Sequence, residues 1–334
     1  MNPRRIAAIF VARNREFVRD RSALAWSILL PLVIVFGFAF AFSGKAPERF
    51  TIGVIGPAPD GAAAMQLEHV EYVTFEQHEP ALEKVRRHEI DLLIEPSTQR
   101  YWVSDASPSG YVLERVLAGV AGADSGYERH GVPGRTIRYV DWLVPGLLAM
   151  NMMFAALFGV GFVIVRYRKN GVLKRLKATP LTPAEFLVAQ LGSRLIIIVA
   201  VTAAIFVGSN SILDYPVRGS YPDLLLVLVL GGICLVSLSL TIAARTASEE
   251  LAGGLLNMIS WPMMFLSGVW FSTEGLHPWL QYLAQALPLT HVIDAARAVM
   301  IDGAGLGQIW LHLAVLAAMS AVFLVLGSRL FRWE

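Results

Sequence analysis

The sequence offers few side chains whose types and spacing could carry out catalysis. Gly44 and Lys45 resemble the end of a phosphate-binding loop, but the earlier glycine is missing and Ala46 stands where that loop needs Ser or Thr. The patterns H-E-x-x-H and G-x-S-x-G are absent, as are paired Asp-rich motifs that could hold Mg²⁺ at a membrane face. Asp294 and Arg297 are expected to pair with each other rather than to catalyse. We therefore predict that the chain is not an enzyme and binds no cofactor or metal ion itself.

Polar residues inside apolar runs are better candidates for function. Asn151 and Asn257 each lie in a long apolar segment that is rich in methionine. Polar groups within a membrane are functional candidates by default, and the flexible Met side chain adapts to varied apolar ligands. Helix packing is the alternative explanation for both segments. The candidate residues in these segments are Asn151, Met152, Phe154, Asn257, Met258 and Met264.

A basic loop at residues 166–185 has the features of a coupling element. Its middle can form a short helix with an apolar side and a basic side, which Thr179 and Pro180 end. Thr182 can cap the next helix, because Pro183 occupies its first position and Glu185 stands three residues after the cap. A short helix joined stiffly to a membrane span suits the transmission of motion from a cytosolic partner, although an ordinary basic inner loop also fits. The predicted coupling residues are Gly171, Val172, Leu173, Lys174, Arg175, Leu176, Lys177, Thr179 and Pro180.

The elements that must hold these residues are membrane spans. The chain has 334 residues, of which 55% are hydrophobic and 16% charged, so it has more apolar surface than one soluble domain can bury. Its net charge of +2 is too small to indicate a nucleic-acid partner. A hydrocarbon core of about 30 Å needs about 20 apolar residues per helix. We predict six spans, at Leu24–Phe42, Trp142–Val165, Phe186–Gly208, Leu224–Ala244, Leu251–Phe271 and Ile309–Leu326.

Lysine and arginine are concentrated in alternate loops, which predicts the orientation of the spans. They cluster ahead of the first span and after the second, and they also follow the fourth and the sixth. Cytoplasmic loops carry such an excess, so both termini are predicted to be cytoplasmic. A cleaved signal peptide is the alternative for the first apolar run, but that run is too long for one and five more follow.

The predicted domains follow from these spans. Residues 1–22 form an interfacial amphipathic helix and 23–43 the first transmembrane helix, while 44–140 form an α/β domain outside the membrane. Residues 141–334 form a five-helix transmembrane region with the coupling loop at 166–185 and an outer re-entrant segment at 272–306, which contains Pro288, His291, Asp294 and Arg297. In the α/β domain we predict strands at Phe50–Ile55, Val70–Phe75, Ile90–Ile94 and Tyr101–Val103, and helices at Pro80–His88 and Tyr111–Gly122.

These features together resemble the permease subunits of the ATP-binding-cassette type-2 exporter family. No single motif is specific, and it is their order and spacing over almost the whole chain that carry the resemblance. The matching features are the basic N-terminal helix, the domain after the first span, the Gly171–Pro180 loop with Leu173, Leu176 and Thr179, Leu266-Ser267-Gly268, Pro278-Trp279, and the run from Pro288-Leu289-Thr290-His291 to Arg297.

The resemblance implies a permease subunit with six transmembrane helices in a bacterial inner membrane. It implies a second permease subunit, as a homodimer or heterodimer, and a separate cytosolic ATPase dimer that binds ATP and Mg²⁺. The family would place the Val172–Lys177 helix on the ATPase. It would also place the second and fifth spans at the centre of the permease dimer, where substrate passes. The resemblance therefore implies a substrate pathway lined by Asn151, Met152, Phe154, Asn257, Met258 and Met264. Membrane lipid and a periplasmic adaptor protein are further expected partners, and no nucleic acid is expected.

The expected function is therefore export of an amphipathic or hydrophobic compound, drug-like or lipid-like, from the cytoplasm or inner leaflet. Two alternatives stay open. The chain could export an ion, although it has no dense charged path across the membrane. It could also be a membrane receptor or assembly platform whose outer domain binds a protein.

Overall fold

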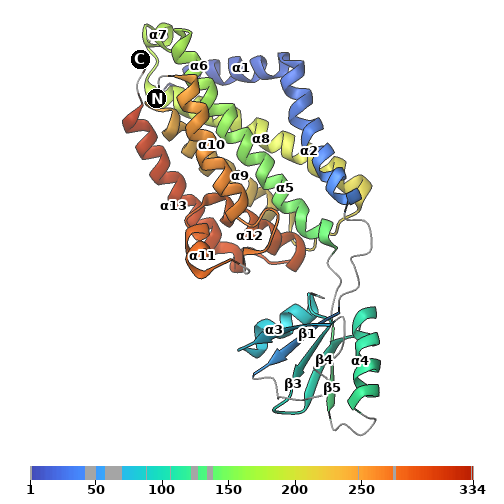
Figure 1. The fold of residues 1–334 in the computed structure, drawn as a ribbon. Helices are drawn as coiled ribbons and strands as arrows, with labels where there is room; N and C mark the ends of the chain where they lie inside the picture. The colour runs from blue at the N-terminus through green and yellow to red at the C-terminus, as the bar shows by residue number, and fades with distance from the viewer. Residues whose placement is uncertain are drawn as a thin grey trace. The chain divides into compact units, whose positions relative to one another are not determined.

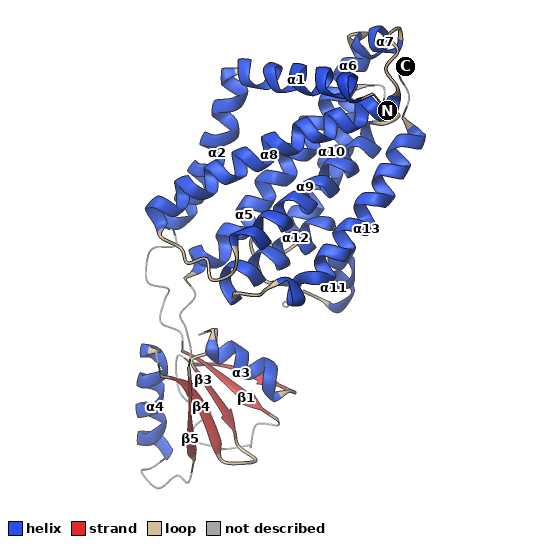
Figure 2. Ribbon diagram, turned by 180° about the vertical axis from the view of Figure 1, so that it is seen from behind, coloured by secondary structure: helices blue, strands red, loops and turns tan. Residues whose placement is uncertain are grey.

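The protein was analysed as a computed structural model, in which the chain divides into two compact units. One consists of Met1–Ala41 and Val140–Glu334, and the other of Phe42–Tyr139. Figures 1 and 2 show the first unit as a body of helices and the second as a sheet with helices. Gly44 and Lys45, which resemble a phosphate-binding loop in sequence, lie outside the described residues. The structure describes all residues except 1, 42–49, 57–69, 88, 106, 122–126, 134–137, 247, 274–275, 332 and 334.

The larger unit is helical throughout its described elements. Helices α5, η2 and α6 run on from one another as a single stretch, Tyr139–Lys169, in which η2 is a π-helical segment. The elements are α1 (Pro3–Arg19), α2 (Arg21–Ala41), α5 (Tyr139–Ala156), η2 (Leu157–Phe162), α6 (Val163–Lys169), α7 (Val172–Lys177), α8 (Pro183–Leu213), α9 (Tyr221–Ala243), α10 (Glu249–Leu266), α11 (Pro278–Gln285), α12 (Pro288–Arg297), η4 (Ala298–Asp302) and α13 (Leu306–Leu330).

Four helices in the described part of the chain are long and apolar enough to cross a membrane: Tyr139–Lys169, α8, α9 and α13. A fifth is added if α1 and the part of α2 at Leu24–Phe40 are counted as one span, although the two meet at a bend of 64°. The predicted fifth span corresponds to α10, which has only 18 residues and carries Glu249 and Glu250 in its first turn. These carboxylates shorten its apolar stretch. The structure thus shows a mostly helical membrane protein with four or five candidate spans, and six spans remain a prediction.

Helix α9 forms the centre of this unit and packs against α8, α12, α13 and η2. Close packing depends on Gly231, where an added Cβ atom would lie 2.6 Å from the side chain of Val292 on α12. A π-helical turn disrupts the regular backbone hydrogen bonds, and two side chains from other helices bond the carbonyls there. Ser239 Oγ donates to Leu157 O at 2.8 Å, and Arg194 Nε donates to Ala155 O at 3.3 Å.

The smaller unit contains a five-stranded mixed sheet in the order β2-β1-β3-β4-β5. Strand β1 pairs in parallel with β2 and β3, β3 pairs antiparallel with β4, and β4 pairs in parallel with β5. Helices α3 and α4 cover opposite faces, each over its own apolar core. The elements are β1 (Phe50–Ile55), β2 (Val70–Phe75), α3 (His78–Arg86), β3 (Leu92–Glu95), β4 (Arg100–Ser104), α4 (Pro108–Ala121) and β5 (Glu128–Val132).

Candidate functional site

Helix α7 presents a basic surface at one end of the helical unit, near the chain termini in Figure 1. It begins at Gly171, whose φ of +69° lies in the left-handed region that favours glycine. Leu173 is fully buried, and Val172 and Leu176 are half-buried. The side chains of the remaining predicted coupling residues, Lys174, Arg175, Lys177, Thr179 and Pro180, are exposed. Leu173 therefore anchors the helix, and the basic residues form its outer face.

The base of α7 is fastened to two further helices. Arg168, at the end of α6, donates hydrogen bonds to the carbonyls of Ala243 and Ala244, both at 3.0 Å, and to that of Thr246. The guanidinium group thus bonds the free carbonyls at the C-terminal end of α9, where a cation is also favoured by the helix dipole. Lys169 Nζ lies 3.5 Å from the carboxylate of Glu249 at the start of α10. The sequence prediction did not include Arg168, because only the fold brings those carbonyls to it.

The other end of the coupling loop is fastened to α1. The capping box predicted for α8 is present, with Glu185 N bonded to Thr182 Oγ1 at 3.3 Å and Thr182 N to the Glu185 carboxylate at 3.0 Å. The same carboxylate accepts a hydrogen bond from Asn2 N at 2.6 Å, and Arg5 donates to the carbonyl of Pro180. Contacts of the segment 166–185 thus reach α1, α9 and α10.

Arg297 joins the predicted re-entrant segment to two neighbouring helices through partly buried contacts. Arg297 donates to the carbonyls of Trp142, at 3.1 Å, and Gly268, at 2.7 Å, and its guanidinium group lies 3.6 Å from the centroid of the Trp142 ring. Arg297 thus joins α12 to the start of α5 and the end of α10, while Asp294 lies within electrostatic range of it. Pro288 takes the first position of α12, where its missing N–H costs nothing.

A histidine pair joins α12 to α13. His291 Nδ1 and His312 Nδ1 lie 3.1 Å apart, and His291 Nε2 lies 2.8 Å from the carbonyl of Gln285. A carbonyl only accepts, so His291 Nε2 carries the proton and its Nδ1 accepts from His312 when both rings are neutral. His291 was predicted from the sequence, whereas His312, which is 21 residues away on another helix, was not.

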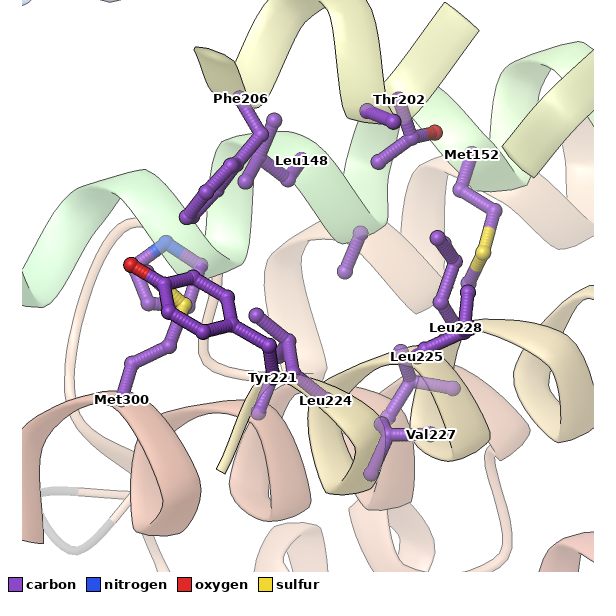
Figure 3. Close-up of a pocket in the computed structure, with 15 residues that line it drawn as sticks. Leu148, Met152, Thr202, Phe206, Tyr221, Leu224, Leu225, Val227, Leu228 and Met300 are labelled. Carbon is purple, nitrogen blue, oxygen red and sulfur yellow. The ribbon is translucent and has the colours of Figure 1, made fainter. Parts of the chain in front are cut away.

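The six predicted pathway residues lie in three different places within this chain. Asn151 and Phe154 line a cavity of about 280 Å³ between α2 and α5, and Asn151 Nδ2 has no hydrogen-bond partner among the described residues. Met152 lines a different cavity, between α5, α8 and α9 (Figure 3). Asn257 and Met258 lie on the exposed side of α10, whereas Met264 is buried. The fold of this chain alone thus does not bring these residues together.

The exposed side of α10 is a continuous apolar stripe. Leu251, Met258, Trp261 and Phe265 follow one another at helical spacing, and each is more than half exposed. The rings of Trp261 and Phe265 stack with centroids 6.0 Å apart. Asn257 lies beside the stripe and bonds its own helix, from Nδ2 to Gly253 O at 2.9 Å.

The helices and the loop described above correspond to a known family. A family model described as ABC-2 family transporter protein matches residues 21–329. The chain belongs to the ABC-2 transporter family. This confirms the family predicted from the sequence, and the match includes both the helical unit from α2 onward and the sheet unit.

Several known proteins are similar to parts of this chain. It is 25% identical over 190 residues to the inner membrane transport permease YhhJ of Escherichia coli (strain K12), covering 56% of this chain and 51% of that protein. It is 25% identical over 201 residues to the daunorubicin resistance ABC transporter permease protein DrrB1 of Streptomyces coeruleorubidus, covering 59% and 70%. Nodulation protein J of Rhizobium meliloti (strain 1021) is 27% identical over 202 residues, covering 59% and 74%. The chain thus spans only about half the length of YhhJ.

Proposed function

We propose that this ABC-2 family member is the permease subunit of an exporter that moves an amphipathic or hydrophobic compound out of the cytoplasm or the inner leaflet. A separate cytosolic ATPase dimer, which binds ATP and Mg²⁺, supplies the energy. The observation that carries the proposal is α7, an exposed basic helix whose base is fastened to α9 and α10 and whose following loop is fastened to α1. The names of two relatives, a daunorubicin resistance permease and a probable multidrug permease, support a drug-like compound.

In this proposal the exposed face of α7, formed by Lys174, Arg175 and Lys177, binds an acidic groove of the ATPase. Arg168 and Lys169 pass the displacement of α7 to α9 and α10. ATP binding and hydrolysis then shift the equilibrium between permease conformations, because the ATPase binds them with different affinity. Leu173 holds α7 on the body of the permease and makes no direct contact with the ATPase.

A second permease subunit would cover the apolar stripe on α10. Four large exposed side chains in a row form a patch of the kind that marks an interaction site. Pairing two subunits at this stripe would place Asn257 and Met258 at the dimer centre. The cavity between α2 and α5 supplies a further hydrogen-bonding group, the amide of Asn151. We include in this proposal six spans, cytoplasmic termini, an extracytoplasmic sheet unit and a periplasmic adaptor as its partner.

The test is charge reversal on α7. The variant Lys174→Glu/Arg175→Glu/Lys177→Glu should reduce copurification of the ATPase at least tenfold and abolish stimulation of ATP hydrolysis by candidate compounds. Its thermal midpoint should stay unchanged, since all three side chains are exposed. Arg329→Glu, at an exposed basic residue near the end of α13 and outside these contacts, is the control for charge reversal and should leave both readouts intact.

Unchanged ATPase binding and stimulation in the triple variant would refute the coupling role of α7. If no ATPase copurified with the unmodified chain, the receptor or assembly-platform alternative would be favoured instead. Stimulation by ions but by none of the hydrophobic compounds would favour the ion exporter.

A further inference from the structure

A second cavity lies away from the apolar stripe on α10. It has a volume of about 150 Å³ and is enclosed by α5, α8, α9, α12 and η4. Figure 3 shows Thr202 and Phe206 of α8 on one wall, leucines of α9 on the other, and Met152 and Met300 at opposite ends. Ala203 and Leu225, which are exposed, lie at its mouth between α8 and α9.

The side chains that line the cavity are apolar apart from the hydroxyl groups of Thr202, which is buried, and Tyr221, which is 59% exposed. Thr202 is 6% exposed, and its side-chain oxygen has no hydrogen-bond partner in the part of the chain that the structure describes. A threonine within a helix commonly bonds the carbonyl four residues earlier. Thr241 and Thr246 do so, at 2.9 Å and 2.7 Å, whereas Thr202 does not. A buried hydroxyl without a partner is unfavourable, so a ligand that supplies one is stabilised here.

The surroundings restrict what this ligand can be. The outward-facing side chains of α8 and α9 are apolar and exposed, including Val207 and Leu225, so the mouth faces the interior of the bilayer. A dry apolar cavity of this size holds a group about as large as one aromatic ring. Thr202 lies 11 residues before the outer end of α8, roughly 16 Å along the helix.

The depth of Thr202 in the membrane distinguishes two kinds of ligand, a compound dissolved in the membrane and a membrane lipid. The headgroup region is only about 7 Å thick on each side of the bilayer, so Thr202 lies within the hydrocarbon core. Lipid acyl chains carry no oxygen at that level, whereas a small compound dissolved in the membrane can bring one. The hydroxyl of Thr202 therefore favours a compound over an acyl chain.

We propose that this cavity, with Thr202 as its buried hydrogen-bonding group, binds one apolar ring of a membrane-dissolved compound that carries a carbonyl, ether or hydroxyl oxygen. It would be a lateral binding site for the class of compound proposed above for export, and to that extent it rests on the proposed function. Met152 and Met300 adapt the two ends of the cavity to different rings.

The experiment uses benzophenone, which combines apolar rings with one carbonyl and forms covalent adducts on irradiation. The full chain in lipid nanodiscs is irradiated with it, and the adducts are located by peptide mass spectrometry. Met152 and Met300 are 1% and 2% exposed, so they can be labelled only by a probe inside the cavity. We expect saturable labelling of one or both.

Three variants test the site. Thr202→Val keeps the shape and removes the hydroxyl, so it should reduce labelling roughly two- to tenfold, as the loss of one hydrogen bond does. Ala203→Phe fills the mouth and should abolish labelling. Ala204→Phe changes the next residue, which is exposed but does not line the cavity, and should leave labelling unchanged. Thermal midpoints of all three are measured to confirm folding.

Two results would overturn the proposal. One is labelling that is unaffected by Thr202→Val or equally reduced by both phenylalanine variants. The other is labelling of the two methionines by a photoactivatable acyl-chain lipid that Thr202→Val does not weaken, which would assign the cavity to lipid. None of these readouts involves the ATPase, so this proposal and the coupling proposal can fail separately.

Discussion

We expect Arg168 to stabilise the base of α7 more than Arg166, the other arginine of α6. Arg168 is half-buried and bonds the carbonyls of Ala243, Ala244 and Thr246. Each hydrogen bond to a charged group contributes about 1.5–3 kcal/mol, and the helix dipole adds about 0.3–1 kcal/mol. Water reaches part of this site and the three bonds share one guanidinium group, so the values do not add. We expect Arg168→Ala to lower the free energy of unfolding by about 3 kcal/mol.

The assay compares Arg168→Ala with Arg166→Ala on the same helix. Arg166 is exposed and lies over the ring of Phe162, so its loss should cost no more than about 0.5 kcal/mol. For a chain of this size, 3 kcal/mol corresponds to a fall in thermal midpoint of about 5 °C in purified protein. Hydrogen exchange at residues 243–246 should also accelerate in Arg168→Ala only. Arg168→Lys should be intermediate, because an ammonium group cannot span three carbonyls.

Equal thermal midpoints and equal exchange in the two alanine variants would refute this reasoning. The three carbonyls would then be satisfied by water, and the end of α9 would not be attached to α6 through Arg168. Faster hydrogen exchange in Arg168→Ala with no change in its thermal midpoint would show that Arg168 stabilises only the end of α9 and not the whole fold.

Further predictions concern backbone, packing and pH. Gly171→Ala should destabilise α7 by about 1 kcal/mol because of the left-handed φ, while Gly171→Asn should be tolerated better, as measured by thermal unfolding. In the sheet unit, Gly110→Ala should lower the free energy of unfolding by about 1–3 kcal/mol, since the added Cβ would lie 2.9 Å from Asp91 O. Gly119→Ala, in the same helix, meets nothing within 4 Å and should be neutral or stabilising. Protease resistance of the full chain measures both effects. Burial, and then the hydrogen bond to Glu114, raise the pKa of Tyr101 to about 12. The contribution of neutral Tyr101 to the stability of the folded protein is therefore complete below pH 10 and is lost as pH rises through about 12. Tyr101→Phe should remove one late-titrating tyrosine from an absorbance titration; an unchanged titration curve would contradict this.

Local sequence was sufficient for the features that depend on composition and short spacing. The residue ranges of β1 and β2 are those predicted, and the capping box at Thr182 and Glu185 is present. These signals succeed because a cap or a strand edge depends on neighbours in the chain. Long apolar runs likewise predicted the four candidate spans, because the thickness of the bilayer sets the length of a membrane-spanning helix.

Other features depended on the tertiary structure. Strand β5 was not predicted because Glu128–Val132 is polar, and it becomes a strand only by pairing with β4 at the edge of the sheet. The bonds of Arg168 to the end of α9 and of His312 to His291 join residues that are far apart in sequence.

The predicted pathway residues show the physical reason most clearly. A membrane helix such as α5 is apolar on nearly every side, so its sequence does not indicate which side faces which neighbour. Only packing decided that Asn151 and Met152, adjacent in the chain, line different cavities. The sequence by itself therefore determined that this chain is a membrane protein of the ABC-2 type, and the rotation of its helices determined which residues share a site.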